Sequence, residues 1–414
     1  MKHTTRLRVN IDNRVVGELG VDRRGRIHFQ YDTSWLKTGF DLSPGTLPFN
    51  DTVQLSPEPQ EFNGLHGVFT DSLPDGWGML LMDRAFLQLA KWQRNEITPL
   101  DRLAYIGSRA MGALSYEPAI PLSASSDRVD IALLAKSATQ LLEGETPEVL
   151  RQLQLQGGSP GGARPKLTVA LSESSEECLS GFNELPAGFT HWLVKFRSQE
   201  DPQDIGRIEM AYADMARIAG MDMPECRLLK VEFSDRIDEY FAVQRFDRES
   251  STRYHLLSLA GYVYADYRLP SIGYDTVIKA TRQITGNMGE AEKAFRLMVF
   301  NVLTHNKDDH AKNFAFLHRS GEWVLSPAYD LTFSTGLNNQ HTTDIAGSGN
   351  PQLSDIKRLA RDCGIKRWKE IVEQVSVTTE RWADFARQRG VSVVEIKRIE
   401  SELEKIAHRV LRVS

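Results

Sequence analysis

The chain has 414 residues, which is too long for one compact core and predicts two or three domains. Hydrophobic residues make up 41% and charged residues 25%, a composition typical of a soluble globular protein rather than of a disordered one. Fifty basic and fifty-five acidic residues give a formal charge of −5. This balance argues against nucleic-acid binding as an autonomous function, because phosphate contacts need a basic surface.

The three cysteines, Cys178, Cys226 and Cys363, are far apart and form no C-x-x-C pair. They predict reduced, packed thiols in a cytosolic protein. The first residues lead into a strand-like stretch without an apolar signal core, and no window holds the roughly eighteen uncharged apolar residues of a membrane span. We therefore expect a soluble, cytoplasmic protein with no membrane association.

The N-terminal part of the chain predicts a β-rich region. Residues 6–30 alternate apolar and polar side chains and are broken by Arg24-Gly25, as in a β-hairpin. Asp75-Gly76 then opens a predicted helix over residues 77–89. The mostly polar stretch 124–151 indicates a connector with one short amphipathic helix.

The middle of the chain predicts the order strand, strand, helix, strand, strand. The expected elements are residues 167–171, 190–196, 207–219, 227–233 and 240–246. This order is typical of the small lobe of a kinase.

From about residue 254 the pattern becomes mostly helical. One helix, with its buried face over residues 295–303, ends just before a polar loop. A short hairpin is predicted over residues 314–317 and 323–325, and further helices over residues 354–363, 380–389 and 394–410.

The polar loop and the residues after the hairpin carry the most specific pattern of the sequence. Asp308 and Asn313 have the D-x-x-x-x-N spacing of a kinase catalytic loop, and Asp330 follows the hairpin where a second metal ligand belongs. Such a loop needs one carboxylate to orient the attacking hydroxyl, and an Asn and a second carboxylate to hold Mg²⁺. An ordinary polar loop is the alternative interpretation.

Two further side chains of this loop are catalytic candidates. His310 is expected to buttress the loop, and Lys312 to neutralise charge on the transferring phosphoryl group; for both, a solvated loop residue is the alternative. His305 and His310 do not predict a zinc site, because no third ligand is near in the sequence.

A glycine-rich segment and a lysine on an apolar strand indicate nucleotide binding. The segment Gly157–Lys166 includes Gly161, Gly162 and Ala163, and its glycines allow close approach of the backbone to a phosphate. It is neither a Walker A loop nor G-x-G-x-x-G, and by itself it is equally consistent with a flexible linker. Lys195 on the following strand needs an anion unless it reaches solvent from an edge strand.

Taken together, these motifs resemble the HipA family of bacterial serine/threonine kinases, the toxins of type II toxin–antitoxin systems. The resemblance covers nearly the whole chain. Its N-terminal part includes Asp71-Ser72-Leu73-Pro74-Asp75-Gly76, and its C-terminal part the run from Gly161 to Lys166, Gln244-Arg245-Phe246-Asp247-Arg248, Asn306 to Asn313 and Pro327-Ala328-Tyr329-Asp330.

The resemblance implies an α+β, two-lobed protein-kinase-like fold with a β-rich N-terminal subdomain and an all-helical C-terminal lobe. The implied domains are residues 1–123, 124–248 with the glycine-rich loop and ATP lysine, and 249–414 with the catalytic loop.

The implied site roles follow the matching motifs. Asp308 is the catalytic base, and Asn313 and Asp330 ligate Mg²⁺. The ATP phosphates are held by Gly161, Gly162, Ala163, Lys166 and Lys195, the Gln244–Phe246 backbone forms the adenine hinge, and Asp247 lies close to the ribose. Arg207-Ile208 precedes Glu209 where the family often has Asn-Glu, and Gln244 stands where a Glu is common.

The resemblance further implies an ATP- and Mg²⁺-dependent kinase whose protein substrate is a translation factor such as an aminoacyl-tRNA synthetase. The implied partner is a helix-turn-helix HipB-like antitoxin, through which the chain would reach DNA only indirectly. Two alternatives stay open, namely a small-molecule phosphotransferase and a catalytically inactive regulatory binding protein. Ser159 stands where the family carries an autophosphorylated serine, and a serine that merely begins the Pro-Gly turn is the alternative.

Overall fold

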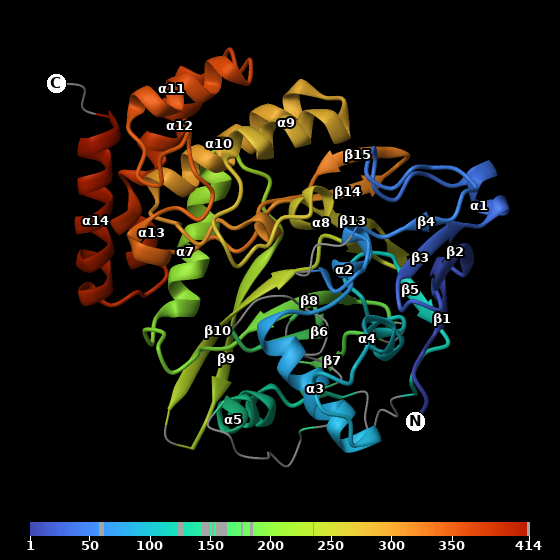
Figure 1. Cartoon of the computed structure of the whole chain (residues 1–414). Coiled ribbons are helices and arrows are strands. Elements are labelled where there is room, and N and C mark those ends of the chain that lie inside the picture. Colours follow the sequence, from blue (N-terminus) through green and yellow to red (C-terminus); the bar gives the residue numbers. More distant parts are fainter. Residues whose placement is uncertain are drawn as a thin grey trace. The chain divides into compact units, whose positions relative to one another are not determined.

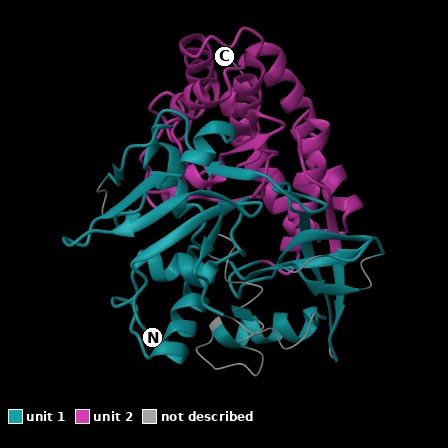
Figure 2. Cartoon of the chain, turned by 90° about the vertical axis from the view of Figure 1, so that its right-hand side faces the viewer, with its two compact units in different colours: residues 1–201, 229–257, 261–264 teal, residues 202–228, 258–260, 265–414 magenta. Residues whose placement is uncertain are grey.

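The computed structural model describes most of the chain (Figure 1), namely residues 1–57, 62–121, 128–142, 150, 153–154, 164–174, 177–182, 185–234 and 236–411. It divides into two compact units (Figure 2), with residues 1–201, 229–257 and 261–264 in unit 1 and residues 202–228, 258–260 and 265–414 in unit 2. No described helix is both long and apolar enough to cross a membrane.

Unit 1 begins with an antiparallel five-stranded sheet. Its order is β4 (Gln54–Leu55), β3 (Ile27–Tyr31), β2 (Arg14–Val21), β1 (Arg6–Ile11) and β5 (Ser115–Glu117). Along β1, Leu7 and Val9 are buried and Arg6 and Arg8 are exposed, so the alternation seen in the sequence does place one face in the core. The accompanying helices are α1 (Thr33–Thr38), α2 (Gly67–Thr70), α3 (Gly76–Ala90) and α4 (Pro99–Ile106).

A second five-stranded sheet carries the predicted nucleotide residues. Its order is β7 (Cys178–Ser180), β6 (Lys166–Ser172), β8 (Phe189–Lys195), β10 (Ile237–Gln244) and β9 (Cys226–Glu232). Leu167, Val169 and Trp192 of this sheet share a core with Leu134 of helix α5 (Ile131–Leu142) and Trp77 of α3. The strands predicted over residues 167–171, 190–196 and 240–246 are therefore confirmed. Three short strands follow, β11 (Arg248–Glu249), β12 (Thr252–Arg253) and β13 (His255–Ser258), and then helix α8 (Leu259–Val263).

The described part of unit 2 is mostly helical and contains a hairpin, which the sequence also predicted. The hairpin pairs β14 (Ala315–Arg319) with β15 (Glu322–Leu325). The helices are α7 (Ile205–Ile218), α9 (Tyr274–Thr285), α10 (Met288–Leu303), α11 (Leu353–Asp362), α12 (Trp368–Thr379), α13 (Trp382–Gln388) and α14 (Val393–Leu411).

Helix α7, which the sequence pattern associates with the small-lobe strands, belongs to unit 2. The Tyr212 hydroxyl donates to the carbonyl oxygen of Thr304 at 2.6 Å, directly after α10. Asp214 forms an ion pair with Arg389 at 2.5 Å, after α13. These contacts fix α7 beside the helix that leads into the polar loop.

Candidate active site

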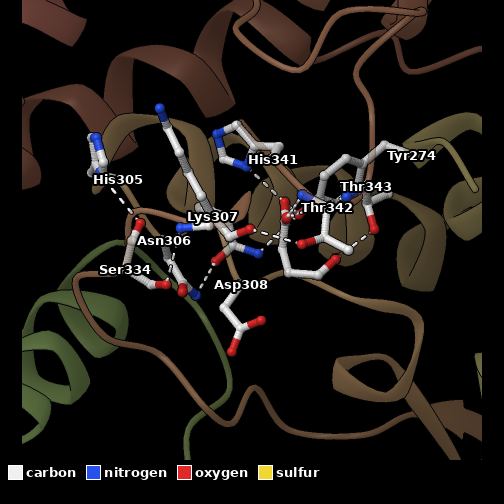
Figure 3. A network of polar contacts seen from close by, with 12 residues as sticks. Tyr274, His305, Asn306, Lys307, Asp308, Ser334, His341, Thr342 and Thr343 are labelled. Atoms are coloured by element: carbon white, nitrogen blue, oxygen red, sulfur yellow. Dashed lines mark hydrogen bonds and ion pairs between the residues drawn. The ribbon is translucent and has the colours of Figure 1, made fainter. Parts of the chain in front are cut away.

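The predicted catalytic loop leaves α10 through a sharp turn. Thr304 caps the helix, and His305 takes the left-handed conformation with a φ of 56°. In the residues that follow, Lys307 is 2% exposed and Asp309 is 1% exposed, whereas Asp308 between them is exposed. The side chain of Asp308 is therefore exposed between two buried charged neighbours, and it points away from Lys307 (Figure 3).

Asn313 lies close to Asp308, as the spacing predicted. It ends the short 3₁₀ helix η2 (Ala311–Asn313), and its Nδ2 donates to the carbonyl oxygen of Asp308 at 2.7 Å. This bond uses the donor side of the amide, so Oδ1 is the atom that Asn313 can offer to a cation. The two predicted site residues are thus tied together through the main chain.

Asp330 follows the hairpin in an unusual conformation. Its φ is 56°, in the left-handed region that non-glycine residues rarely adopt. The Tyr329 hydroxyl donates to the carbonyl oxygen of Lys312 at 2.5 Å, and Asn306 Nδ2 donates to the carbonyl oxygen of Asp330 at 3.4 Å. The main chain around Asp330 is therefore connected to both ends of the catalytic loop, and such strained residues are common at functional sites.

His310 and Lys312 both lie beside Tyr267. The Lys312 ammonium lies over the Tyr267 ring at 4.4 Å from its centroid, and the His310 and Tyr267 rings are 5.5 Å apart. Both side chains are partly buried rather than fully solvated. A buttressing role for His310 and phosphoryl contact for Lys312 remain predictions.

A buried carboxylate that the sequence reasoning missed anchors this loop from behind. Asp309 Oδ2 accepts hydrogen bonds from the Tyr274 hydroxyl and from His341 Nδ1, each at 2.8 Å. Its Oδ1 accepts from the backbone N–H groups of Thr342 at 2.9 Å and Thr343 at 3.3 Å (Figure 3). These partners lie 32 to 35 residues from Asp309 along the chain, and no local pattern signals them.

Lys307 anchors the loop on the other side of Asp308. Its ammonium donates to the carbonyl oxygen of Asn339 at 2.7 Å and to the Oδ1 atoms of Asn339 at 2.8 Å and Asn350 at 3.0 Å. Burial, followed by the neighbouring charge of Arg409, lowers the pKa of Lys307 to about 8. All three acceptors are uncharged, so these hydrogen bonds hold the backbone of the loop in position and do not form an ion pair.

In unit 1, two of the predicted phosphate-binding lysines are paired across neighbouring strands. Lys166 of β6 lies opposite Lys195 of β8, and the two are 5% and 9% exposed. Directly paired residues project from the same face of a sheet, so both lysine side chains lie on one face of this sheet. The Lys195 ammonium lies 5.5 Å from the centroid of the Phe241 ring. Two buried lysines on one face of a sheet are compatible with an anionic ligand there.

Asp247, predicted near the ribose, lies in a buried ion-pair cluster. It accepts from the Gly112 N–H at 2.7 Å, from Arg245 at 2.7 and 3.0 Å, and from Arg248 at 2.8 Å. Burial raises the pKa of Asp247, but the guanidinium groups of Arg245 and Arg248 outweigh it and hold the pKa far below its usual range. A ribose contact stays a prediction, and it would require this carboxylate to release one of these donors.

The predicted hinge follows the end of β10. Gln244 is the last residue of that strand, and the next N–H, of Arg245, donates to the carbonyl oxygen of His191 at 2.9 Å. A role for the main chain of Gln244 and Phe246 in adenine binding stays a prediction. Lys195 and Glu209 lie in different units, and their pairing also stays a prediction.

Ser159, Gly161, Gly162 and Ala163 lie outside the described residues. Among the described residues, no group of three or more His, Cys, Asp or Glu side chains is placed to hold a metal ion by itself. Mg²⁺ in phosphoryl-transfer sites takes one or two carboxylates and completes its shell with waters and substrate phosphates. Asn313 Oδ1 and the Asp330 carboxylate are hard oxygen donors of that type.

Comparison with known proteins identifies two family models in the chain. The model of the HipA-like C-terminal domain matches residues 158–383, and that of the HipA N-terminal domain matches residues 7–117.

Curated relatives and a solved structure agree with these models. Y4mE of Sinorhizobium fredii, named as a candidate kinase, is 26% identical over 97% of this chain and 90% of its own length. Y4dM of the same organism, also named as a candidate kinase, is 28% identical over 46% of this chain, and the match spans only 49% of Y4dM. A chain from the complex of HipA, HipB and operator DNA of Shewanella oneidensis is 18% identical, with a TM-score of 0.71 over 98% of this chain and 97% of that chain. The structural likeness confirms the predicted HipA-like α+β fold.

Proposed function

Because the chain belongs to the HipA family, we propose that it is an ATP- and Mg²⁺-dependent protein serine/threonine kinase. The observation that carries this proposal is the arrangement of unit 2. Asp308 is an exposed carboxylate between the buried residues Lys307 and Asp309, and its own carbonyl oxygen orients the Asn313 amide. Asp330 follows in a strained conformation connected to the same loop. A phosphoryl-transfer site needs these three groups.

Each group then has a defined chemical task. Asp308 accepts the proton of the attacking serine or threonine hydroxyl while the new oxygen–phosphorus bond forms and the bond from the γ-phosphorus to ADP breaks. Asn313 and Asp330 would hold Mg²⁺, which when bound neutralises charge on the phosphates. Lys312 lies on the same loop and would stabilise negative charge on the transferring group.

The lysines of unit 1 supply the ground-state binding of the nucleotide in this proposal. Lys166 and Lys195 emerge from one face of the sheet and are buried, which suits the α- and β-phosphates. Gly161, Gly162 and Ala163 would contribute backbone N–H groups, and the main chain of Gln244 and Phe246 would bind adenine. Asp247 would reach the ribose only after giving up one of its present donors.

We propose that the protein substrate is a translation factor such as an aminoacyl-tRNA synthetase. The proposed partner is a helix-turn-helix antitoxin of the HipB kind. The solved relative from Shewanella oneidensis is found in complex with HipB and operator DNA. The net charge of −5 supports DNA contact through such a partner rather than through this chain alone.

Autophosphorylation at Ser159 would switch the kinase off. A phosphoserine adds about −1.5 to −2 charges, which would compete with ATP phosphates at the glycine-rich segment. Mass spectrometry of enzyme incubated with ATP tests the modification, and ATP affinity of the Ser159→Asp variant tests its effect. Finding Ser159 unmodified in active enzyme would contradict the autophosphorylation. Unchanged ATP affinity in the Ser159→Asp variant would contradict its inhibitory effect.

The deciding experiment for the kinase is the Asp308→Asn variant. It should lower phosphate transfer by about 10²- to 10⁴-fold, as expected for loss of a general base, and leave ATP affinity nearly unchanged. Transfer at the wild-type rate would refute the assignment of Asp308. Incubating the enzyme with labelled ATP and cell lysate shows whether the label enters protein or small metabolites. A protein without Mg²⁺-dependent ATP turnover that binds an antitoxin tightly would favour the inactive regulatory alternative.

A further inference from the structure

Asp309 has no task in the mechanism above, although it is adjacent to the proposed base. Four donors converge on its carboxylate: the Tyr274 hydroxyl, His341 Nδ1 and the backbone N–H groups of Thr342 and Thr343. The group is 1% exposed, so substrate cannot reach it in this conformation. A carboxylate buried with this many donors fixes its own position and that of the backbone that carries it.

Three of the four donors of Asp309 and two of the three acceptors of Lys307 come from one stretch of chain, residues 339–343. Thr342 and Thr343 bind Asp309, while Asn339 binds Lys307, and Thr342 N–H also donates to the carbonyl oxygen of Lys307 at 3.1 Å. Asp308 is thus flanked on both sides by charged residues that the same segment holds. Figure 3 shows its carboxylate pointing away from the Lys307 side chain.

A chain of polar contacts continues from Asp309 to the proposed metal ligand. The Tyr274 hydroxyl donates to Asp309 and accepts from Asn301 Nδ2 at 2.9 Å. Asn301 Oδ1 accepts from Asn306 Nδ2 at 2.9 Å, and Asn306 Nδ2 also donates to the carbonyl oxygen of Asp330 at 3.4 Å. Asp309 is therefore connected to the backbone of both Asp308 and Asp330.

We propose that Asp309 is a positioning residue, which sets the geometry of Asp308 and Asp330 for phosphate transfer without touching substrate. This inference rests on the proposed function. Catalysis by positioning is sensitive to small displacements, and a shift of about 1 Å can cost about 10²-fold in rate. A protein whose loop lacks this anchor should still bind nucleotide, because the Asp309 contacts do not hold the lysines of unit 1.

The Asp309→Asn variant tests the proposal. An amide has one acceptor atom in place of two, so at least one of the four donors loses its partner and faces the NH₂ group. We expect kcat for transfer to fall about tenfold to a hundredfold, with KM for ATP nearly unchanged. Asp384→Asn is the matched control, because Asp384 lies in the same unit and its exposed side chain pairs with the exposed Arg387, at 3.2 Å.

A second, more conservative variant keeps the test valid if Asp309→Asn fails to fold. Tyr274→Phe keeps the ring that packs edge-on against Phe314 at 5.5 Å, but removes the hydroxyl shared by Asp309 and Asn301. We expect a smaller fall in kcat in the same direction. Amide hydrogen exchange of peptides covering residues 305–314 should accelerate in both variants, whereas peptides from the strands of unit 1 should be unaffected.

The readouts separate this inference from the proposed function. A wild-type protein that transfers no phosphate overturns the proposed function, and the positioning role with it. With an active wild type, unchanged kcat in both variants, unchanged exchange of the loop, or exchange that accelerates throughout the chain overturns the positioning role alone. A large rise in KM for ATP with unchanged kcat does the same.

Discussion

The buried ion-pair cluster of unit 1 leads to a quantitative prediction for Asp247→Asn. Asp247 is 1% exposed and is the charge partner of Arg245 and Arg248, whose side chains are also buried. Removing one partner of a buried pair leaves uncompensated charge and typically costs about 3–5 kcal/mol. We expect the free energy of unfolding of the unit 1 transition to fall by about that amount.

The pH dependence of this effect follows from the depressed pKa of Asp247. A carboxylate whose pKa is lower in the folded state stabilises the fold above its unfolded pKa, and this stability is lost as the pH falls through the folded value. The unfolded value is about 3.9. The difference between wild type and variant should therefore be constant from neutral pH to about 5 and disappear only in stronger acid.

Urea unfolding followed by circular dichroism measures both effects. Glu18→Gln is a suitable control, because Glu18 forms an exposed ion pair with Arg6 at 3.2 Å, and such pairs contribute about 0–1 kcal/mol. A loss below about 1 kcal/mol in Asp247→Asn, comparable with that of the control, would refute the view that the arginines depend on this carboxylate.

Three further predictions concern other parts of the chain. For Lys307→Met, urea unfolding should show that the stability of wild type relative to the variant rises with pH above about 8. In that range the lysine of the folded protein loses its proton, whereas the lysine of the unfolded chain keeps it. A difference that does not change with pH would contradict the lowered pKa. Lys195→Met should raise the Kd for Mg²⁺-ATP about tenfold or more in a titration with a fluorescent analogue. Gly67→Ala should lower the melting temperature clearly, since a Cβ there would lie 1.8 Å from the Gly261 carbonyl oxygen, whereas Gly20→Ala, with nothing within 4 Å, should not clash.

The sequence predicted those elements whose signal is local. The apolar runs of β6 and β8 and the alternation along β1 each depend on neighbours within a few residues. The spacing of Asp308 and Asn313 is likewise local, and in the structure the Asn313 side chain donates a hydrogen bond to the carbonyl oxygen of Asp308. Motifs of this kind are read from short windows and need no knowledge of packing.

Contacts between distant segments could not be predicted in this way. The bond from the Gly112 N–H to Asp247 spans 135 residues, and that from Tyr274 to Asp309 spans 35. Nothing in the residues around Asp309 distinguishes it from a solvated loop carboxylate. The only available signal was its position beside Asp308 in a loop that follows a strongly apolar helix.

The contrast between Asp308 and Asp309 shows why burial, not residue type, separates their roles. The two adjacent residues have the same side chain, yet the backbone directs one to solvent and the other into a site with four donors. A buried carboxylate with saturated acceptors cannot take a proton from substrate without losing hydrogen bonds, so it suits positioning. An exposed carboxylate on a fixed backbone is accessible to a substrate hydroxyl, so Asp308 suits proton transfer, and the rigidity that makes it effective comes from its neighbours.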